Sequence, residues 1–168
     1  MRYYKIIGKF GLVKTNILNT KLRQVYLPDA DIRKELYNGN LAKAMFMTAC
    51  TIESYLRHIY IMEKSKNKQK ILIKELVKYR NVNLSNIIRF CKDNKFFNNK
   101  DVRIINFMRE VRNDIAHNHM LLYDQNLSKR ICIKTIEETF PVLHRLHTIS
   151  MEQEQERKRF LSHPLTYK

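Results

Sequence analysis

Residues 41–63, LAKAMFMTACTIESYLRHIYIME, contain the pattern that decides the fold. Apolar side chains recur there at alternating intervals of four and three residues, at Met45, Ala49, Ile52, Leu56 and Ile59. This spacing places them on one face of an α-helix. We therefore predict a long amphipathic helix from Leu41 to about Glu63, with Asn40 as its N-terminal cap.

Shorter segments on either side of this helix also carry helical signals. Residues 29–37, DADIRKELY, place acids in the first turn of a short helix that Asn38-Gly39 would stop. After the long helix, we predict one helix from about Lys68 to Tyr79 and a short one from Leu84 to Cys91.

Two longer amphipathic helices are predicted in the second half of the chain. The first begins at Asp101 as its cap, and its inward row is Ile104, Ile105, Met108, Val111 and Ile115. The second begins near Leu127, and its inward row is Ile133, Ile136, Phe140, Leu143 and Leu146. We expect Pro141 to kink or split this last helix. The residues from Met151, MEQEQERKRF, are polar on every face and are expected to extend the helix or to fray.

Length and composition favour a single helical domain. The chain has 168 residues, and its three glycines and three prolines leave little material for the turns of an all-β fold. We predict an all-α, up-and-down helical bundle of four main helices over residues 29–150. Residues 1–28 are expected to form a basic N-terminal extension, irregular or weakly helical, and residues 151–168 a charged tail.

Composition also argues against a membrane protein and a disulfide scaffold. No apolar run reaches the length that a membrane-spanning helix needs. Cys50, Cys91 and Cys132 are far apart and form no Cys-x-x-Cys pair, so neither a disulfide framework nor a zinc knuckle is expected. Three isolated cysteines suit a reducing compartment, and we expect a cytoplasmic protein.

The charge balance points to a polyanionic partner. Lysine and arginine number 32 against 16 acids, a formal net charge of +16, and such a field attracts nucleic acid. Residues 1–28 contain six basic groups and no acid, among them Lys5, Lys9 and Lys14. A second basic run contains a single acid, Glu75, among Lys64, Lys66, Lys68, Lys70, Lys74, Lys78 and Arg80. We expect these two runs to bind an RNA backbone, the alternative being a solvated helix surface.

Two charged residues do not fit the apolar rows. On a helical wheel, Arg112 lies about 20° from Ile105, and Glu53 lies about 40° from Ala49. An arginine that faces a core is costly unless an anion meets it. Either Arg112 and Glu53 form a buried pair that orders the bundle, or Glu53 holds Arg112 toward an anion in a cleft.

A histidine, His117, lies five positions after Arg112, with four residues between them. On a continuous helix the two side chains would lie about 140° apart. They can serve one site if the helix ends near Ala116, or if a twofold axis brings two copies together. A histidine can move the proton of a ribose 2′-hydroxyl, and an arginine can stabilise the pentavalent phosphate, so the pair suffices for metal-free RNA cleavage.

The stretch REVRNDIAHN, Arg109 to Asn118, resembles the signature of the HEPN superfamily, in which Arg-Asn is followed a few residues later by His. The segment that follows, HNHMLLYDQN, is similar to the abortive-infection branch of that superfamily. The helix AMFMTACTIESYLRHIY, with its glutamate, adds to the resemblance. The likeness covers about residues 30–150 and leaves out the basic extension and the tail.

This resemblance implies a function and assigns roles to matching positions. Arg112 and His117 would be the catalytic arginine and histidine, Asn113 would orient the histidine or the phosphate, and Glu53 would position the arginine. Proteins of this kind are typically homodimers that cleave RNA without a metal or cofactor, leaving a 2′,3′-cyclic phosphate, and many are toxins or phage-defence nucleases. The expected partners are RNA as substrate, a dedicated small RNA or an antitoxin.

Two other interpretations compete with this one. The chain could be a non-catalytic helical RNA-binding module whose Arg112 is structural. A metal site could be built from His117, His119, His144 and His147, but no acid or cysteine accompanies them at ligand spacing, so no metal is expected. The sequence contains neither a Gly-rich phosphate loop nor a Gly-x-Ser-x-Gly motif, so neither an NTPase nor an esterase is expected.

Overall fold

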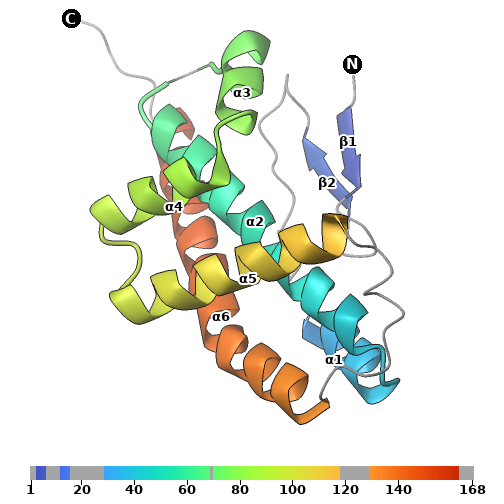
Figure 1. Cartoon of the computed structure of the whole chain (residues 1–168). Helices are drawn as coiled ribbons and strands as arrows, with labels where there is room; N and C mark the ends of the chain where they lie inside the picture. The colour runs from blue at the N-terminus through green and yellow to red at the C-terminus, as the bar shows by residue number, and fades with distance from the viewer. Residues whose placement is uncertain (1–2, 7–11, 16–28, 69, 118–128, 163–168) are drawn as a thin grey trace, which may run out of the picture.

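The computed structural model describes residues 3–6, 12–15, 29–68, 70–117 and 129–162 (Figure 1). Its elements are β1 (Tyr3–Ile6), β2 (Leu12–Thr15), α1 (Asp29–Tyr37), α2 (Leu41–Ser65), α3 (Ile73–Arg80), α4 (Leu84–Asp93), α5 (Asn99–His117) and α6 (Lys129–Ser162). From α1 onward, the predicted all-α helical bundle is confirmed in the described residues. In the part of the chain that is described, no helix is long and apolar enough to cross a membrane.

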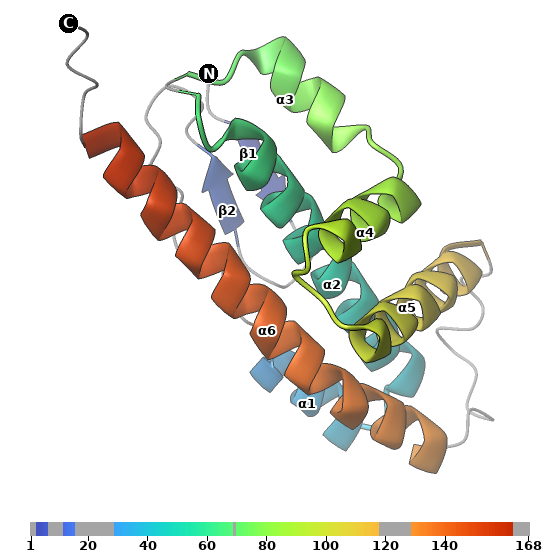
Figure 2. The same ribbon diagram turned by 90° about the vertical axis from the view of Figure 1, so that its left-hand side faces the viewer.

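Helix α2 lies at the centre, in contact with α1, α3, α4, α5 and α6. Figures 1 and 2 show α1 and the start of α6 at one end of the bundle, and α3 and the end of α6 at the other. The chain runs along α2, returns through α3 and α4, crosses α2 with α5, and runs along α2 again with α6. Helices α2 and α6 therefore point in the same direction, and three contacts follow this order: Tyr55 with His147, Glu63 with Gln153, and Ser65 with Arg157.

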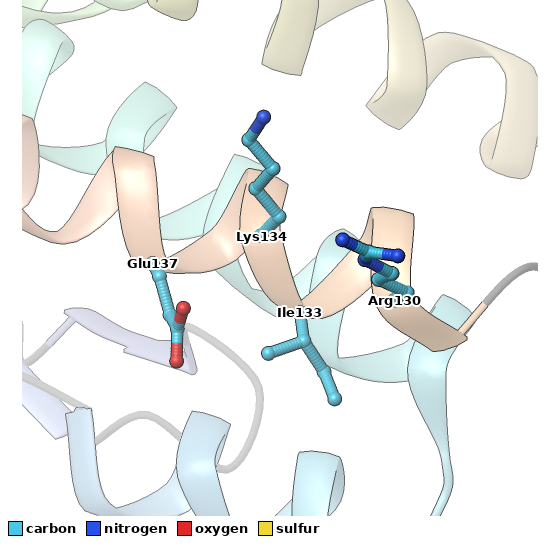
Figure 3. Close-up of a pocket in the computed structure, with 4 residues that line it drawn as sticks. All are labelled: Arg130, Ile133, Lys134 and Glu137. Atoms are coloured by element: carbon cyan, nitrogen blue, oxygen red, sulfur yellow. The ribbon is translucent and has the colours of Figure 1, made fainter.

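The apolar rows predicted from helical spacing form the core. All five residues of the α2 row are buried, as are Ile105, Met108 and Ile115 of α5 and four residues of the α6 row, Ile136, Phe140, Leu143 and Leu146. Ile133, the first member of the α6 row, is only partly buried. It lies with Arg130, Lys134 and Glu137 beside an open surface depression in the first turns of α6 (Figure 3).

The structure confirms one predicted cap position and corrects the other. Asn40 is the N-cap residue of α2, but its side chain makes no cap hydrogen bond, and its backbone dihedral angles, −81° and 62°, differ from the extended geometry of a cap. Its side-chain Nδ2 instead donates to Glu35 Oε2 over 2.7 Å. Asp101 lies inside the first turn of α5, and Asn98 precedes that turn. Asn98 Oδ1 accepts from Asp101 N over 2.9 Å, and Asp101 Oδ2 accepts from Asn98 N over 3.2 Å, which is a reciprocal capping box.

Three other predictions are corrected in whole or in part. Helix α3 begins at Ile73 rather than near Lys68. Of the two effects expected at Pro141, a kink or a split, the split is not found, because α6 is continuous from Lys129 to Ser162. The proline is exposed, so the backbone carbonyl that loses its helical partner can be solvated. Within the N-terminal extension, predicted to be irregular or weakly helical, β1 and β2 pair antiparallel, with Tyr3 opposite Thr15.

The residues from Met151 extend α6 to Ser162, and polar side chains attach this part of the helix to the end of α2. Gln153 Nε2 donates to Glu63 Oε2 over 3.1 Å, and Arg157 donates to the backbone oxygen of Ser65. Gln153, Glu154 and Arg157 are all buried. The polar composition of this segment therefore serves an interior contact between α2 and α6.

His58 of α2 makes the bundle sensitive to acid. Burial lowers the pKa of His58 from 6.5 to about 4, against the opposing effect of Glu154, and its Nε2 atom has no hydrogen-bond partner among the described residues. Unfolded chains take up this proton below pH 6.5, whereas the folded protein does so only near pH 4. Stability is therefore highest above pH 6.5 and should fall by up to about 3 kcal/mol as the pH is lowered to 4.

This pH effect can be measured by urea unfolding of the wild type and of the His58→Gln variant at several pH values between 7 and about 4. The unfolding free energy of the wild type should fall more steeply with decreasing pH than that of the variant, because only the wild type carries the titrating imidazole. A difference between the two proteins that stays constant across this range would assign the acid sensitivity to other groups.

Candidate functional site

Glu53 of α2 binds two arginines, one with each carboxylate oxygen. Oε2 lies 3.4 Å from Arg112 Nε of α5, and Oε1 lies 2.8 Å from Arg57 Nε, one turn further along α2. The contact between Arg112 and Glu53, inferred from the helical wheel, is thus present in the structure. It joins α5 to α2 at the edge of the core.

The pair of Arg112 and Glu53 is not buried, in contrast to one of the two alternatives drawn from the sequence. The Arg112 side chain is 39% exposed and that of Glu53 17% exposed. Arg112 Nη1 also donates to Asn113 Oδ1 over 3.1 Å. Glu53 and Asn113 therefore both contact the guanidinium, which is accessible to an anion from solvent.

Arg57 is a component of the site that the sequence analysis missed. Its Nη1 donates to the backbone oxygens of Arg80 and Val82, over 2.8 and 2.9 Å, at the end of α3. Arg57 therefore fixes one oxygen of Glu53 and leaves the other for Arg112. The spacing of Glu53 and Arg57, four residues apart in a helix, was a signal for this ion pair.

His117 is the last residue of α5 and is exposed. Helix α5 continues through His117, one residue beyond Ala116, so Arg112 and His117 lie on one continuous helix. Arg112 and His117 consequently lie on faces about 140° apart, and a single chain does not direct both side chains to one point. His119 lies outside the described residues.

The basic run from Lys64 to Arg80 divides into two groups. Several of its members have partners within the protein: Lys64 lies 4.5 Å from the ring centroid of Phe90, Lys66 pairs with Glu63, and Lys68 pairs with Glu75. Arg80 is partly buried. Lys70, Lys74 and Lys78 are exposed and form no ion pair with another described residue.

The structure describes two of the three lysines of the N-terminal extension that were predicted to bind an RNA backbone. Lys5 falls in β1 opposite Val13, and Lys14 falls in β2 opposite Tyr4. Lys9 lies outside the described residues. The structure thus brings Arg112, Asn113 and Glu53 together. Arg57 links Glu53 to the end of the second basic run, because it donates to the backbone oxygen of Arg80.

Other chemistry near this site is limited. Burial raises the pKa of the neighbouring Cys50 thiol to about 11, despite the opposing charge of Arg112, so this thiol is protonated at neutral pH and is a poor nucleophile. Within the described ranges, no group of three or more histidine, cysteine or acidic side chains is placed to hold a metal ion. His147 Nδ1 lies 3.1 Å from the hydroxyl of Tyr55.

The surface depression at the start of α6 lies apart from these residues. Figure 3 shows Ile133 and Glu137 directed to one side of the helix and Lys134 to the other. None of Arg112, His117, Asn113 and Glu53 is among the side chains that line it.

The chain was compared with protein-family models, with curated proteins and with solved structures, and none of them matches it.

The half-exposed geometry predicts a small cost for losing Arg112. Arg112→Ala should lower the unfolding free energy by less than about 1 kcal/mol, because solvent screens this ion pair and Glu53 retains Arg57. Glu53→Gln should cost more, about 1–2 kcal/mol, because it removes the carboxylate from two guanidinium groups at once.

Urea unfolding of both variants measures this order of effects. Lys134→Ala is the matched control, since its pair with Glu138 spans 4.0 Å on an exposed surface and should be worth almost nothing. A loss of about 3–5 kcal/mol for Arg112→Ala would show that the pair behaves as a buried one.

Proposed function

We propose that this protein is a metal-independent endoribonuclease of a prokaryotic phage-defence or toxin–antitoxin system, acting in the cytoplasm as a homodimer. One observation supports this proposal above the others. Glu53 orients Arg112 while more than a third of the arginine stays accessible, and the helix that carries Arg112 ends at the exposed His117. The sequence of this segment resembles the HEPN motif in the same residues.

The chemistry assigned to these residues is transesterification at a phosphodiester. His117 accepts the proton of a ribose 2′-hydroxyl as O2′ forms a bond to phosphorus. Arg112 donates to the phosphate oxygens as negative charge builds on them. The bond from phosphorus to O5′ then breaks, a second histidine protonates O5′, and the products are a 2′,3′-cyclic phosphate and a 5′-hydroxyl. Asn113 and Glu53 hold the guanidinium.

A second copy of the chain supplies the second histidine. Within one chain, Arg112 and His117 lie on different faces of α5, so neither is placed to complete a site alone. Antiparallel packing of two α5 ends about a twofold axis brings the arginine of one copy toward the histidine of the other. This is why the proposal requires a homodimer.

The same geometry favours one alternative function. If no second copy completes the site, separated Arg112 and His117 side chains suit a non-catalytic RNA-binding module. Cleavage and binding must therefore be measured separately.

His117→Ala should abolish RNA cleavage while leaving the fold and salt-sensitive RNA binding almost unchanged. The measurement is cleavage of labelled single-stranded RNA in EDTA, with binding followed by fluorescence anisotropy. His144→Ala, which removes an exposed histidine from α6, is the matched control and should cleave normally. Cleavage by His117→Ala, or activity in the wild type that EDTA removes, would contradict the assigned mechanism.

Mixing the wild type with the inactive His117→Ala variant tests the shared site directly. A mixed dimer contains only one His117, so it lacks the second histidine that protonates O5′ and should be inactive. The activity of a fixed amount of wild type should therefore fall when an excess of His117→Ala is added and the subunits are allowed to exchange. Wild-type activity that stays unchanged in this mixture, or a wild type that sediments as a strict monomer at micromolar concentration, argues against a site shared between copies.

A further inference from the structure

Helix α3 exposes apolar side chains at one end of the bundle. Ile73 and Val77 are 55% and 49% exposed, and Leu72, which precedes the helix, is 55% exposed. No residue of α3 is fully buried. The other large apolar side chains with comparable exposure in the described ranges, Tyr37 and Phe107, lie singly on α1 and α5. The aliphatic group on α3 is thus a continuous feature, and we refer to Leu72, Ile73 and Val77 as the α3 patch.

A row of lysines borders the α3 patch. Ile73 and Val77 are four residues apart and share one face of the helix, and Lys74 and Lys78 form the adjacent row one residue further on. Both lysines are exposed and have no ion-pair partner among the described residues. An apolar row therefore lies directly beside a positive row on the outer side of α3.

The opposite side of α3 is already fixed to the bundle. The ring of Tyr79 packs edge-on against Tyr60 of α2, with centroids 6.2 Å apart. Lys68 pairs with Glu75, and Arg57 binds the backbone at the end of the helix. The helix thus presents its patch in one orientation, on the side away from its contacts with the rest of the described bundle.

We propose that the outer side of α3 is a docking surface for an acidic amphipathic helix of a protein partner. Aliphatic side chains of that helix would cover Ile73 and Val77, and its carboxylates would pair with Lys74 and Lys78. Charge complementarity supports this assignment, since the whole chain carries +16 and the two rows match the two kinds of side chain that such a helix offers.

Two other polyanionic partners fit this surface less well. An RNA backbone gains nothing from exposed aliphatic side chains, and bases stack on aromatic ones, whereas Tyr79, the aromatic residue of α3, faces Tyr60. Amphipathic helices that bind an anionic membrane bury a large apolar area, which includes aromatic side chains. The α3 patch consists of three aliphatic side chains and contains no aromatic one, which suits a contact with one protein helix.

The α3 patch contains none of the proposed RNA-cleaving residues. The end of α3 does contact the candidate site through Arg57, which donates to the backbone oxygen of Arg80 and pairs with Glu53. Figures 1 and 2 place α3 at one end of α2, whereas α5 crosses α2 further along it. Peptide binding is measured without RNA cleavage, so a failure of this proposal can be distinguished from a failure of the ribonuclease activity.

Binding of a synthetic helical peptide tests the proposal. The probe is a fluorescein-labelled peptide with Leu at helical positions i and i+4 and Glu on the flanking positions, followed by fluorescence anisotropy on the full-length protein. The comparison probes are a scrambled peptide of the same composition, phosphatidylglycerol vesicles and single-stranded RNA.

Two double variants separate the contributions of the rows. Ile73→Ala/Val77→Ala removes the apolar row while keeping high helix propensity, and Lys74→Gln/Lys78→Gln removes the positive row. Each should weaken binding of the helical peptide at least tenfold. Tyr37→Ser and Lys134→Gln, which alter an exposed apolar and an exposed basic side chain elsewhere, should leave the affinity unchanged. Circular dichroism confirms that each variant is folded.

The outcomes divide clearly. Binding of the helical peptide, with weak binding of the scrambled one and sensitivity to both double variants, supports the proposal. Equal binding of the scrambled peptide, or no effect of the alanine variant, overturns it. Binding of vesicles that the alanine variant abolishes would assign the α3 patch to a membrane surface instead. Binding of RNA that only the lysine variant weakens would assign it to phosphate recognition.

Discussion

The burial of α2 on several sides at once is the constraint on which the rest of the structure depends. Five other helices contact it, so its side chains are buried well beyond the single apolar row. Thr48 and Thr51 tolerate full burial because their hydroxyls donate to the carbonyl oxygens of Ala44 and Met47, one turn earlier. Every charged group on α2 must therefore find a partner on α2 itself or on a neighbouring element, or reach solvent at the edge of the core.

That constraint explains why the helices and the Arg112–Glu53 contact could be predicted from the sequence. Helical spacing identified the inward rows of α2, α5 and α6 because burial on one face leaves a periodic signal in the residues themselves. The same periodicity placed Arg112 inside the apolar row of one helix and Glu53 at the edge of the apolar row of another. Opposite charges at the edge of a core have few ways to be satisfied, so pairing Arg112 with Glu53 followed from their positions.

What could not be predicted depends on contacts between residues distant in the chain. The segment from Met151 is polar on every face, and its spacing gives no sign that Gln153 and Arg157 are buried. They are buried because the end of α2 offers Glu63 and the carbonyl oxygen of Ser65 as partners, some 90 residues away in the chain. The degree to which Arg112 is exposed likewise depends on the crossing of α5 over α2, which no local pattern records.

In the candidate site, Arg57 makes both a contact that is local in the chain and contacts that are distant in the chain. Its pairing with Glu53 is local, but its second pair of contacts, to the carbonyl oxygens of Arg80 and Val82, ties it to the end of α3. The orientation of Arg112 is therefore set by Glu53, that of Glu53 by Arg57, and that of Arg57 by the backbone at the end of α3. A half-exposed arginine on the surface would otherwise sample many rotamers, each at a cost in entropy when an anion binds. This sequence of contacts keeps the guanidinium both oriented and accessible, which is the property that phosphate recognition requires.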